Sequence, residues 1–195
     1  MHMVEELVRL QLDSLRPHPK NPRLMFREDV IESIRAQLED AGEFSEMHAP
    51  IVRPVNGHYE IISGHHRVEA AKRAKLGSIP CWVKPMTEDE AYMQLVLGNS
   101  QGELSPLEIG IHALGAIEPS EGGRGVMGGV GEYARQLGKT QQYVSQMRQA
   151  AEVLLAVKTH NSSCEFLDKA KHLAAIHKAN RELWPMLVGA LLDKE

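Results

Sequence analysis

The chain has 195 residues, of which 43% are hydrophobic and 25% are charged, and its formal net charge at pH 7 is −4. This composition supplies a hydrophobic core for one compact domain or for a core domain with a small appendage, and it excludes a disordered tail and a protein that coats nucleic acid by bulk charge. No apolar run approaches the roughly 18 residues of a membrane helix, and the N-terminus lacks the order of a secretory signal.

Strands and helices alternate in the pattern of the first 100 residues. Apolar residues on either side of Arg9 predict a strand over 7–12, and three prolines exclude helix and regular strand over 16–23 and predict a loop or turn. Asn56-Gly57 between two β-rich runs predicts a hairpin, because both residue types accept the positive φ angles of a tight turn. In chain order, the other expected elements are a helix over 28–38 that Gly42 ends, hairpin strands within 50–62, a helix over 68–76, a strand over 79–83 and a helix over 88–97.

Beyond residue 100 the β-pattern disappears, which makes the expected fold class α+β. Ser105, Pro106 and Glu108 follow the order of an N-cap, a first-turn proline and a capping-box acid, and they predict a helix start. Six glycines from Pro119 to Gly131 predict a flexible link. The remaining expected helices lie over 130–137, 140–155 and 164–192, the last with a break at Pro185.

The first candidate site is a turn between an expected strand and an expected helix. It has the sequence Ser63-Gly64-His65-His66-Arg67. The N–H groups of the first helical turn converge above such a turn and suit a phosphate, and Arg67 with one or both imidazoles adds charge and donors. Two alternatives stay open: a surface arginine beside histidines that cap the helix, or a metal held by the His pair, although zinc-binding pairs usually stand at i and i+4.

A second candidate site lies between residues 98 and 108. Asn99, Gln101 and a hydroxyl, with two glycines, precede the expected helix start at Ser105. These neutral oxygen and nitrogen atoms suit contact with a ligand or a metal, and nucleotide pockets often lie where two halves of a chain meet. The alternative is a hinge without a ligand.

A third candidate site is a helix-turn-helix pattern over 130–148. Gly138 marks the turn, Thr140 caps a second helix, and Val144 and Met147 of that helix face inward. Gln pairs bidentately with adenine and Arg with guanine, so the outward face can read base edges. The alternative is an ordinary helical hairpin with a solvated polar side. The expected DNA-contacting residues are Lys139, Thr140, Gln141, Gln142, Ser145, Gln146 and Arg148.

In this order the three sites resemble the ParB family of chromosome and plasmid partition proteins, and more loosely its sulfiredoxin-like relatives, over residues 7–160. Asn21-Pro22-Arg23 is similar to the family's opening box, residues 59–70 are similar to its phosphate box, and Asn99 with Gln101 is similar to a further box. The resemblance implies a nucleotide-binding domain with a small mixed sheet at 1–104 and an all-α domain at 105–195 with the helix-turn-helix near 130–150. It also implies that CTP or another nucleoside triphosphate binds with Mg²⁺, and that Asn99 helps to place the metal. The nucleotide-binding residues it implies are Arg23, Ser63, Gly64, His65, His66, Arg67, Asn99 and Gln101.

The chain departs from the family pattern in both boxes. His65-His66 replaces a Glu-Arg pair, Gly98 stands where Glu is usual, and Gly102 stands where Arg is usual. These changes remove carboxylates and a cation, which argues against nucleotide hydrolysis. His65 also occupies the position of the sulfiredoxin cysteine, so the chain lacks a thiol nucleophile there.

The resemblance therefore implies a nucleotide-binding, DNA-binding protein with a partition or transcription-regulatory role, encoded by a plasmid, a phage or a chromosome. We expect a cytoplasmic homodimer with no membrane partner, because one recognition helix reads few base pairs and two half-sites raise affinity. One alternative is a ParB-like nuclease or nucleotide hydrolase, for which Glu60, Glu69 and Glu103 are the candidate metal-binding acids. Another is an interaction module without either activity.

Overall fold

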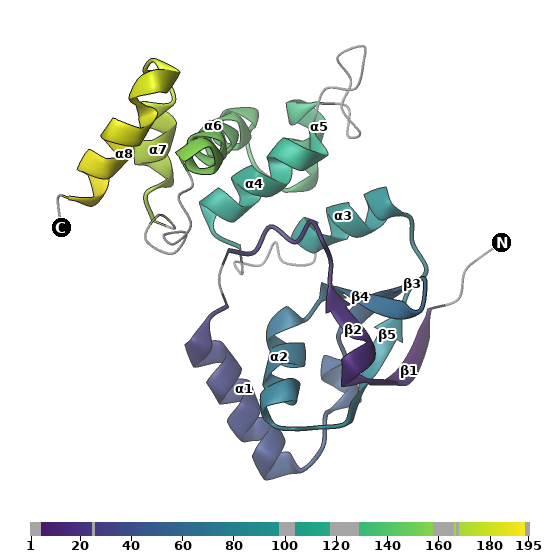
Figure 1. The fold of residues 1–195 in the computed structure, drawn as a ribbon. Helices are drawn as coiled ribbons and strands as arrows, with labels where there is room; N and C mark the ends of the chain where they lie inside the picture. The colour runs from purple at the N-terminus through teal and green to yellow at the C-terminus, as the bar shows by residue number, and fades with distance from the viewer. Residues whose placement is uncertain are drawn as a thin grey trace. The chain divides into compact units, whose positions relative to one another are not determined.

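The computed structural model describes residues 5–24, 26–97, 104–117, 129–157, 166 and 168–193 (Figure 1). These residues divide into two compact units. The first unit contains residues 5–21 and 26–97. The second contains residues 22–24 together with the described residues from 104 onward.

The first unit is built on a mixed five-stranded sheet with the strand order β1-β5-β3-β4-β2. β1 pairs antiparallel with β5, and β3 pairs antiparallel with β4, while β5 lies parallel to β3 and β2 lies parallel to β4. The mixed sheet confirms the α+β fold class. The strands are β1 (Glu6–Gln11), β2 (Leu15–Pro17), β3 (Ile51–Val55), β4 (His58–Ser63) and β5 (Ser78–Val83).

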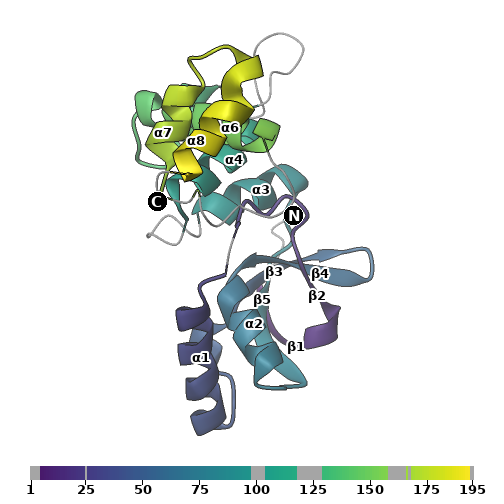
Figure 2. The ribbon, with the colours of Figure 1, turned by 60° about the vertical axis from the view of Figure 1, so that its left-hand side comes forward.

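Two helices of this unit lie side by side, as Figure 2 shows. They are α1 (Glu28–Ala41) and α2 (His65–Arg73), and a third helix, α3 (Glu88–Leu97), follows the last strand. Fully buried side chains from the sheet and from both paired helices form one core, in which burial of apolar surface stabilises the unit. The best-buried members of this core include Leu15, Ile31, Val52, Val68 and Ile79.

The structure confirms that Gly42 ends a helix and that Gly57 lies in a tight turn, and it corrects the prediction for Asn56. Gly42 ends α1 in the left-handed conformation with a φ of 72°. Gly57 has a φ of 84° between the hairpin strands, whereas Asn56 does not take a positive φ. The hairpin therefore needs a left-handed residue only at the third position of its turn.

The expected loop over residues 16–23 is partly wrong. Arg16 and Pro17 belong to β2, which pairs with Glu60 and Ile61 of β4. β2 is the last strand in the sheet order, and an edge strand tolerates proline because the missing N–H faces away from the neighbouring strand.

The second unit is all-α over its described residues. Ser105 and Glu108 form the expected capping box at the start of α4, with Pro106 in the first turn. The Glu108 side chain also accepts a hydrogen bond from the Leu24 amide at 2.7 Å, which ties residues 22–24 to this unit. The helices are α4 (Pro106–Ala116), α5 (Val130–Gln136), α6 (Gln141–Val157), α7 (Ala170–Ile176) and α8 (Trp184–Leu192), with a 3-10 turn at Arg181–Leu183.

The predicted break at Pro185 is wrong. The chain leaves helix after Ile176, and Pro185 lies in the first turn of α8, where a missing N–H costs nothing. Asn180 caps the 3-10 turn that precedes α8, because its side chain accepts a hydrogen bond from the Glu182 amide at 3.2 Å. None of the described helices has the length and apolar composition that crossing a membrane requires.

Candidate nucleotide and DNA sites

The predicted anion-binding turn joins β4 to α2 through Gly64. This residue has a φ of 93° and precedes the first helical residue, His65. A Cβ atom at Gly64 would lie 2.9 Å from Cβ of Pro50 and 3.0 Å from Nη2 of Arg67. The turn is thus closed against any side chain, and glycine alone fits both its backbone angles and its space.

Arg67 lies directly beside this turn. Its guanidinium borders the position that a Gly64 side chain would fill, and its Nη1 atom donates a hydrogen bond to the carbonyl oxygen of His48. The α2 amides of the first turn are the groups that lack partners within a helix. A guanidinium and the positive end of a nine-residue helix therefore stand together at Gly64.

The two histidines of the turn are buried inside the first unit rather than presented to solvent. The exposed fractions of His65 and His66 are 4% and 7%. Nε2 of His66 accepts a hydrogen bond from the Arg27 amide at 3.1 Å, and the Phe26 ring packs edge-on against His66 with centroids 5.5 Å apart. His66 thus fixes the segment before α1 to the start of α2.

The remaining predicted nucleotide-binding residues are Ser63, Arg23, Asn99 and Gln101. Ser63 is the last residue of β4 and is half-buried next to Gly64. Arg23 is half-buried and belongs to residues 22–24, which group with the second unit. Asn99 and Gln101 lie outside the described residues.

The acids considered for a catalytic metal are held by different arginines. Glu60 is buried and accepts a hydrogen bond from Nε of Arg53 at 2.7 Å. Glu69 accepts one from Arg73 at 3.1 Å, and Glu103 lies outside the described residues. Glu60 and Glu69 therefore do not form a shared site.

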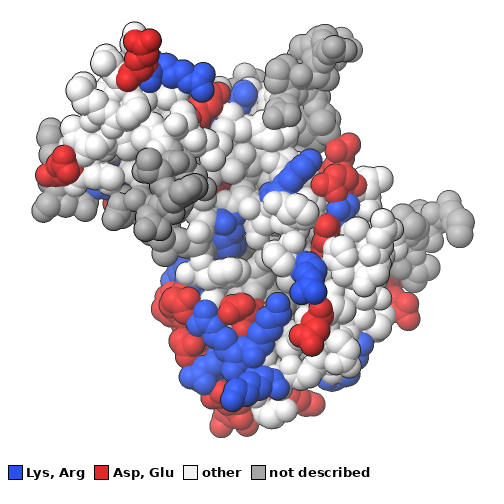
Figure 3. All heavy atoms as spheres, viewed as in Figure 1, with Lys and Arg blue, Asp and Glu red and all other residues white. Residues whose placement is uncertain are grey.

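Arg73 belongs to an ion-pair network over α1 and α2. It bonds Glu28 at 2.6 Å and Glu69 at 3.1 Å, and Arg35 of α1 bonds Glu32 at 2.8 Å. The hydrogen bond from Arg73 lowers the pKa of Glu28 below its ordinary value. Figure 3 shows basic and acidic side chains mixed over these helices, so this surface is charge-balanced and is not a basic patch for nucleic acid.

The predicted helix-turn-helix is present as α5, a turn and α6. Gly138 has a φ of 63° in the turn, and Thr140 caps α6 by accepting a hydrogen bond from the Tyr143 amide at 3.1 Å. Val144 and Met147 are buried as expected. In the unit core, Nδ1 of His112 on α4 lies 2.7 Å from the Tyr133 hydroxyl of α5.

The polar face of α6 is exposed at the start of the helix and half-buried farther along. Lys139 and Thr140 in the turn and Gln141 and Gln142 at the start of the helix are exposed. The other predicted DNA-contacting residues, Ser145, Gln146 and Arg148, are half-buried.

A groove of about 310 Å³ runs along this polar face and adds residues that the sequence did not single out. α7 and the turn after it supply Lys171 and Lys178, both exposed. Lys178 lies beyond the end of α7, so the helical spacing of the sequence does not predict that it lines a groove with Lys171. The residues lining the groove are Gln142, Ser145, Gln146, Gln149, Lys171, Ala174, Ala175 and Lys178.

Two solved structures resemble the chain in fold. C-terminally truncated ParB from Caulobacter crescentus, complexed to the centromeric parS site, has a TM-score of 0.52 and 22% identity, with 94% of this chain and 92% of that chain covered. A Pnob8-like ParB-N domain has a TM-score of 0.55 and 13% identity, with 98% and 86% covered. At these identities the two comparisons support the fold alone.

Sequence comparison adds the family. The chromosome-partitioning protein Spo0J of Thermus thermophilus is 36% identical over 103 residues, which are 52% of this chain and 37% of that protein. The chain thus matches about a third of the length of this curated relative. A family model of the ParB N-terminal domain matches residues 1–100. The chain therefore belongs to the family of proteins that carry the ParB N-terminal domain.

Proposed function

We propose that the chain is a nucleotide-binding and DNA-binding protein of partition or transcription-regulatory type. The observation that carries the proposal is the turn at Gly64, where a helix start, a closed backbone and the Arg67 guanidinium meet. The helix-turn-helix of α5 and α6 supplies the second function. Membership of the ParB family is consistent with both.

The nucleotide is CTP with Mg²⁺, the ligand that the resemblance to the ParB family implies. Amides of the first turn of α2 bind phosphate oxygens, since helix N-termini favour anions. Arg67 leaves the His48 carbonyl and pairs with the phosphates, because a guanidinium binds an oppositely charged phosphate oxygen more strongly than a neutral carbonyl oxygen. Arg23, Ser63, Asn99 and Gln101 complete the proposed site, with Asn99 near the metal.

The buried histidines enter this proposal in a supporting role. His66 is bonded to the Arg27 amide through Nε2, so it positions α2 and does not supply a positive charge to the phosphates. The charge at the turn then depends on Arg67. A loss of Arg67 is expected to remove more affinity than a loss of either histidine.

The DNA partner contacts the polar face of α6. Its glutamines and Arg148 carry the side-chain groups that read adenine and guanine in the major groove. The Caulobacter ParB with the same fold is complexed to a parS site, which supports duplex DNA as the partner. A homodimer would place two such helices on two half-sites.

Calorimetric titration with CTP, ATP, GTP and UTP in millimolar Mg²⁺ tests the nucleotide site. We expect saturable binding of CTP that Arg67→Ala weakens by more than about tenfold, the loss typical of one charge-assisted contact. Arg9→Ala is the matched control, because Arg9 is an exposed arginine of β1. Absence of affinity for all four nucleotides, or equal affinity in the Arg67 and Arg9 variants, would refute the nucleotide site, and binding of another nucleotide without CTP would refute CTP as its ligand.

Selection of duplex DNA from a random library, followed by gel-shift assays, tests the DNA site. We expect one enriched sequence whose binding is lost in Gln146→Ala and Arg148→Ala and retained in Gln37→Ala, an exposed glutamine of α1. Incubation of supercoiled plasmid with protein and Mg²⁺ or Mn²⁺ covers the alternative. Cleavage that Arg67→Ala abolishes would replace this proposal with a nuclease.

A further inference from the structure

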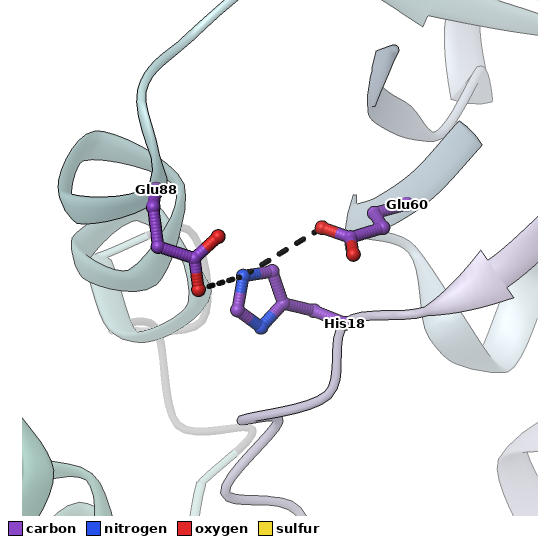
Figure 4. A group of neighbouring side chains, drawn as sticks. All are labelled: His18, Glu60 and Glu88. Atoms are coloured by element: carbon purple, nitrogen blue, oxygen red, sulfur yellow. Dashed lines mark ion pairs between the residues drawn. The ribbon is translucent and has the colours of Figure 1, made fainter. Parts of the chain in front are cut away.

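A buried imidazole faces two carboxylates in the first unit (Figure 4). His18 follows β2, Glu60 lies on β4 and Glu88 begins α3. Nε2 of His18 is 3.7 Å from Oε2 of Glu60 and 3.5 Å from Oε1 of Glu88. One donor atom from each of the three residues lies within 4.8 Å of the others.

The imidazole is the unusual member of this cluster. The side chain of His18 is 0% exposed, and within the described part of the chain its Nε2 atom makes no hydrogen bond. A buried polar atom without a hydrogen bond costs free energy, and a bound ion can satisfy such an atom. Glu88 is 46% exposed at its side chain and gives an ion a route from solvent.

The charges of the cluster leave room for a cation. Arg53 bonds Oε2 of Glu60 at 2.7 Å and Oε2 of Glu88, and it leaves Oε1 of Glu88 on the side of His18. Two carboxylates and one guanidinium sum to one negative charge when His18 is neutral. The remaining positive group is the ammonium of Lys20, which is 3.8 Å from Oε1 of Glu88 and 60% exposed.

We propose that His18, Glu60 and Glu88 form a binding site for a divalent transition metal ion of the Zn²⁺ class. Imidazole nitrogen and carboxylate oxygen are ligands that such ions accept, and three protein ligands leave a position for water. Zn–N and Zn–O bonds of about 2.05 Å place tetrahedral ligands roughly 3.3 Å apart. The two distances from His18, 3.5 and 3.7 Å, therefore need only a small contraction, and the two carboxylate oxygens lie within 4.8 Å of each other.

Binding changes two contacts around the metal. Nδ1 of His18 now accepts a hydrogen bond from the Lys20 amide at 3.1 Å, so the neutral ring carries its proton on Nε2. Ligation through Nε2 moves this proton to Nδ1, and the amide of the exposed residue Lys20 turns to water. The Lys20 ammonium gives way to the metal, while Arg53 stays and orients both carboxylates from the outer sphere.

Calorimetry with Zn²⁺ and visible absorption with Co²⁺ test the site on the whole protein. We expect one saturable site that His18→Gln and Glu88→Gln each weaken by more than about tenfold. His172→Gln and Asp89→Asn are matched controls, because His172 is exposed on α7 and Asp89 is the neighbour of Glu88. Lys20→Met is expected to tighten binding, because it removes the competing cation.

The outcomes distinguish a specific site at His18, Glu60 and Glu88 from non-specific Zn²⁺ binding by the other histidines of the chain. Zn²⁺ affinity that is equal in the His18, Glu88 and control variants overturns the proposal, and so does the absence of a saturable site. Circular dichroism checks that each variant folds. Should His18→Gln unfold, the half-exposed Glu88 and the exposed Lys20 still decide, since only a site at this cluster moves in opposite directions in Glu88→Gln and Lys20→Met.

Discussion

Gly64 combines a left-handed backbone with a lack of space for a side chain. Its φ of 93° and the 2.9 Å approach of Pro50 oppose a methyl group. We expect Gly64→Ala to lower the free energy of unfolding by about 1–3 kcal/mol and to abolish CTP binding. Urea denaturation and calorimetry measure both effects. Gly77→Ala is the control, since a Cβ there meets nothing within 4 Å, and equal behaviour of the two variants would contradict the closed turn.

Cys81 gives a prediction about chemical reactivity at the same scale. The thiol is fully buried on β5, and burial raises its pKa to about 12. The reactive thiolate is therefore nearly absent at about pH 8. In a Cys164→Ser background we expect no reaction with a thiol reagent in the native protein and complete reaction in urea. Rapid native modification would show that β5 opens easily.

At the residue scale the sequence predicted the position of the turn better than the roles of its side chains. Gly64 was recognisable because a glycine between a strand and a helix implies a backbone that only glycine adopts. The burial of His65 and His66 was not recognisable, since a helix start offers both an inner and an outer face. The face that the His66 imidazole takes depends on Phe26 and Arg27, far away in the sequence.

At the scale of single elements, Glu108 holds two segments with one carboxylate. Its Oε1 atom accepts from the Leu24 amide and its Oε2 atom accepts from the Ser105 amide, each at 2.7 Å. Glu108→Gln places an NH₂ group against one of these donors. We expect a loss of about 1–3 kcal/mol in the free energy of unfolding, measured by urea denaturation. Glu43→Gln, at an exposed position, is expected to change it little.

Helix ends that depend on neighbouring residues were predictable from the sequence. Elements that depend on residues far away in the chain were not. The capping box at Ser105 and the stop at Gly42 depend on residues within four positions, and both are confirmed. The strand at Leu15–Pro17 exists because β4 lies beside it. The break before Asn180 was missed because Pro185 is the stronger signal in the sequence, although proline is compatible with a first turn.

At the scale of the whole molecule, the low overall charge confines the proposed DNA contacts to a few cations. Lys171 and Lys178 line the groove beside α6. Each phosphate contact contributes about one unit to the slope of log affinity against log salt, so the double change to methionine is expected to lower that slope by about two. Binding to a selected duplex across a salt series measures it. Lys72→Met on α2 is the control, and an unchanged slope in the double variant would place the DNA elsewhere.

The short strand β2 has a consequence for how copies of this protein meet one another in concentrated solution. The unpaired N–H and C=O groups of an exposed sheet edge can form hydrogen bonds with a strand of a second chain, and such edge pairing leads to fibrous aggregates. Here the edge strand is three residues long and one of them is Pro17, which has no amide hydrogen to donate. The sheet is thereby protected against growth at that end.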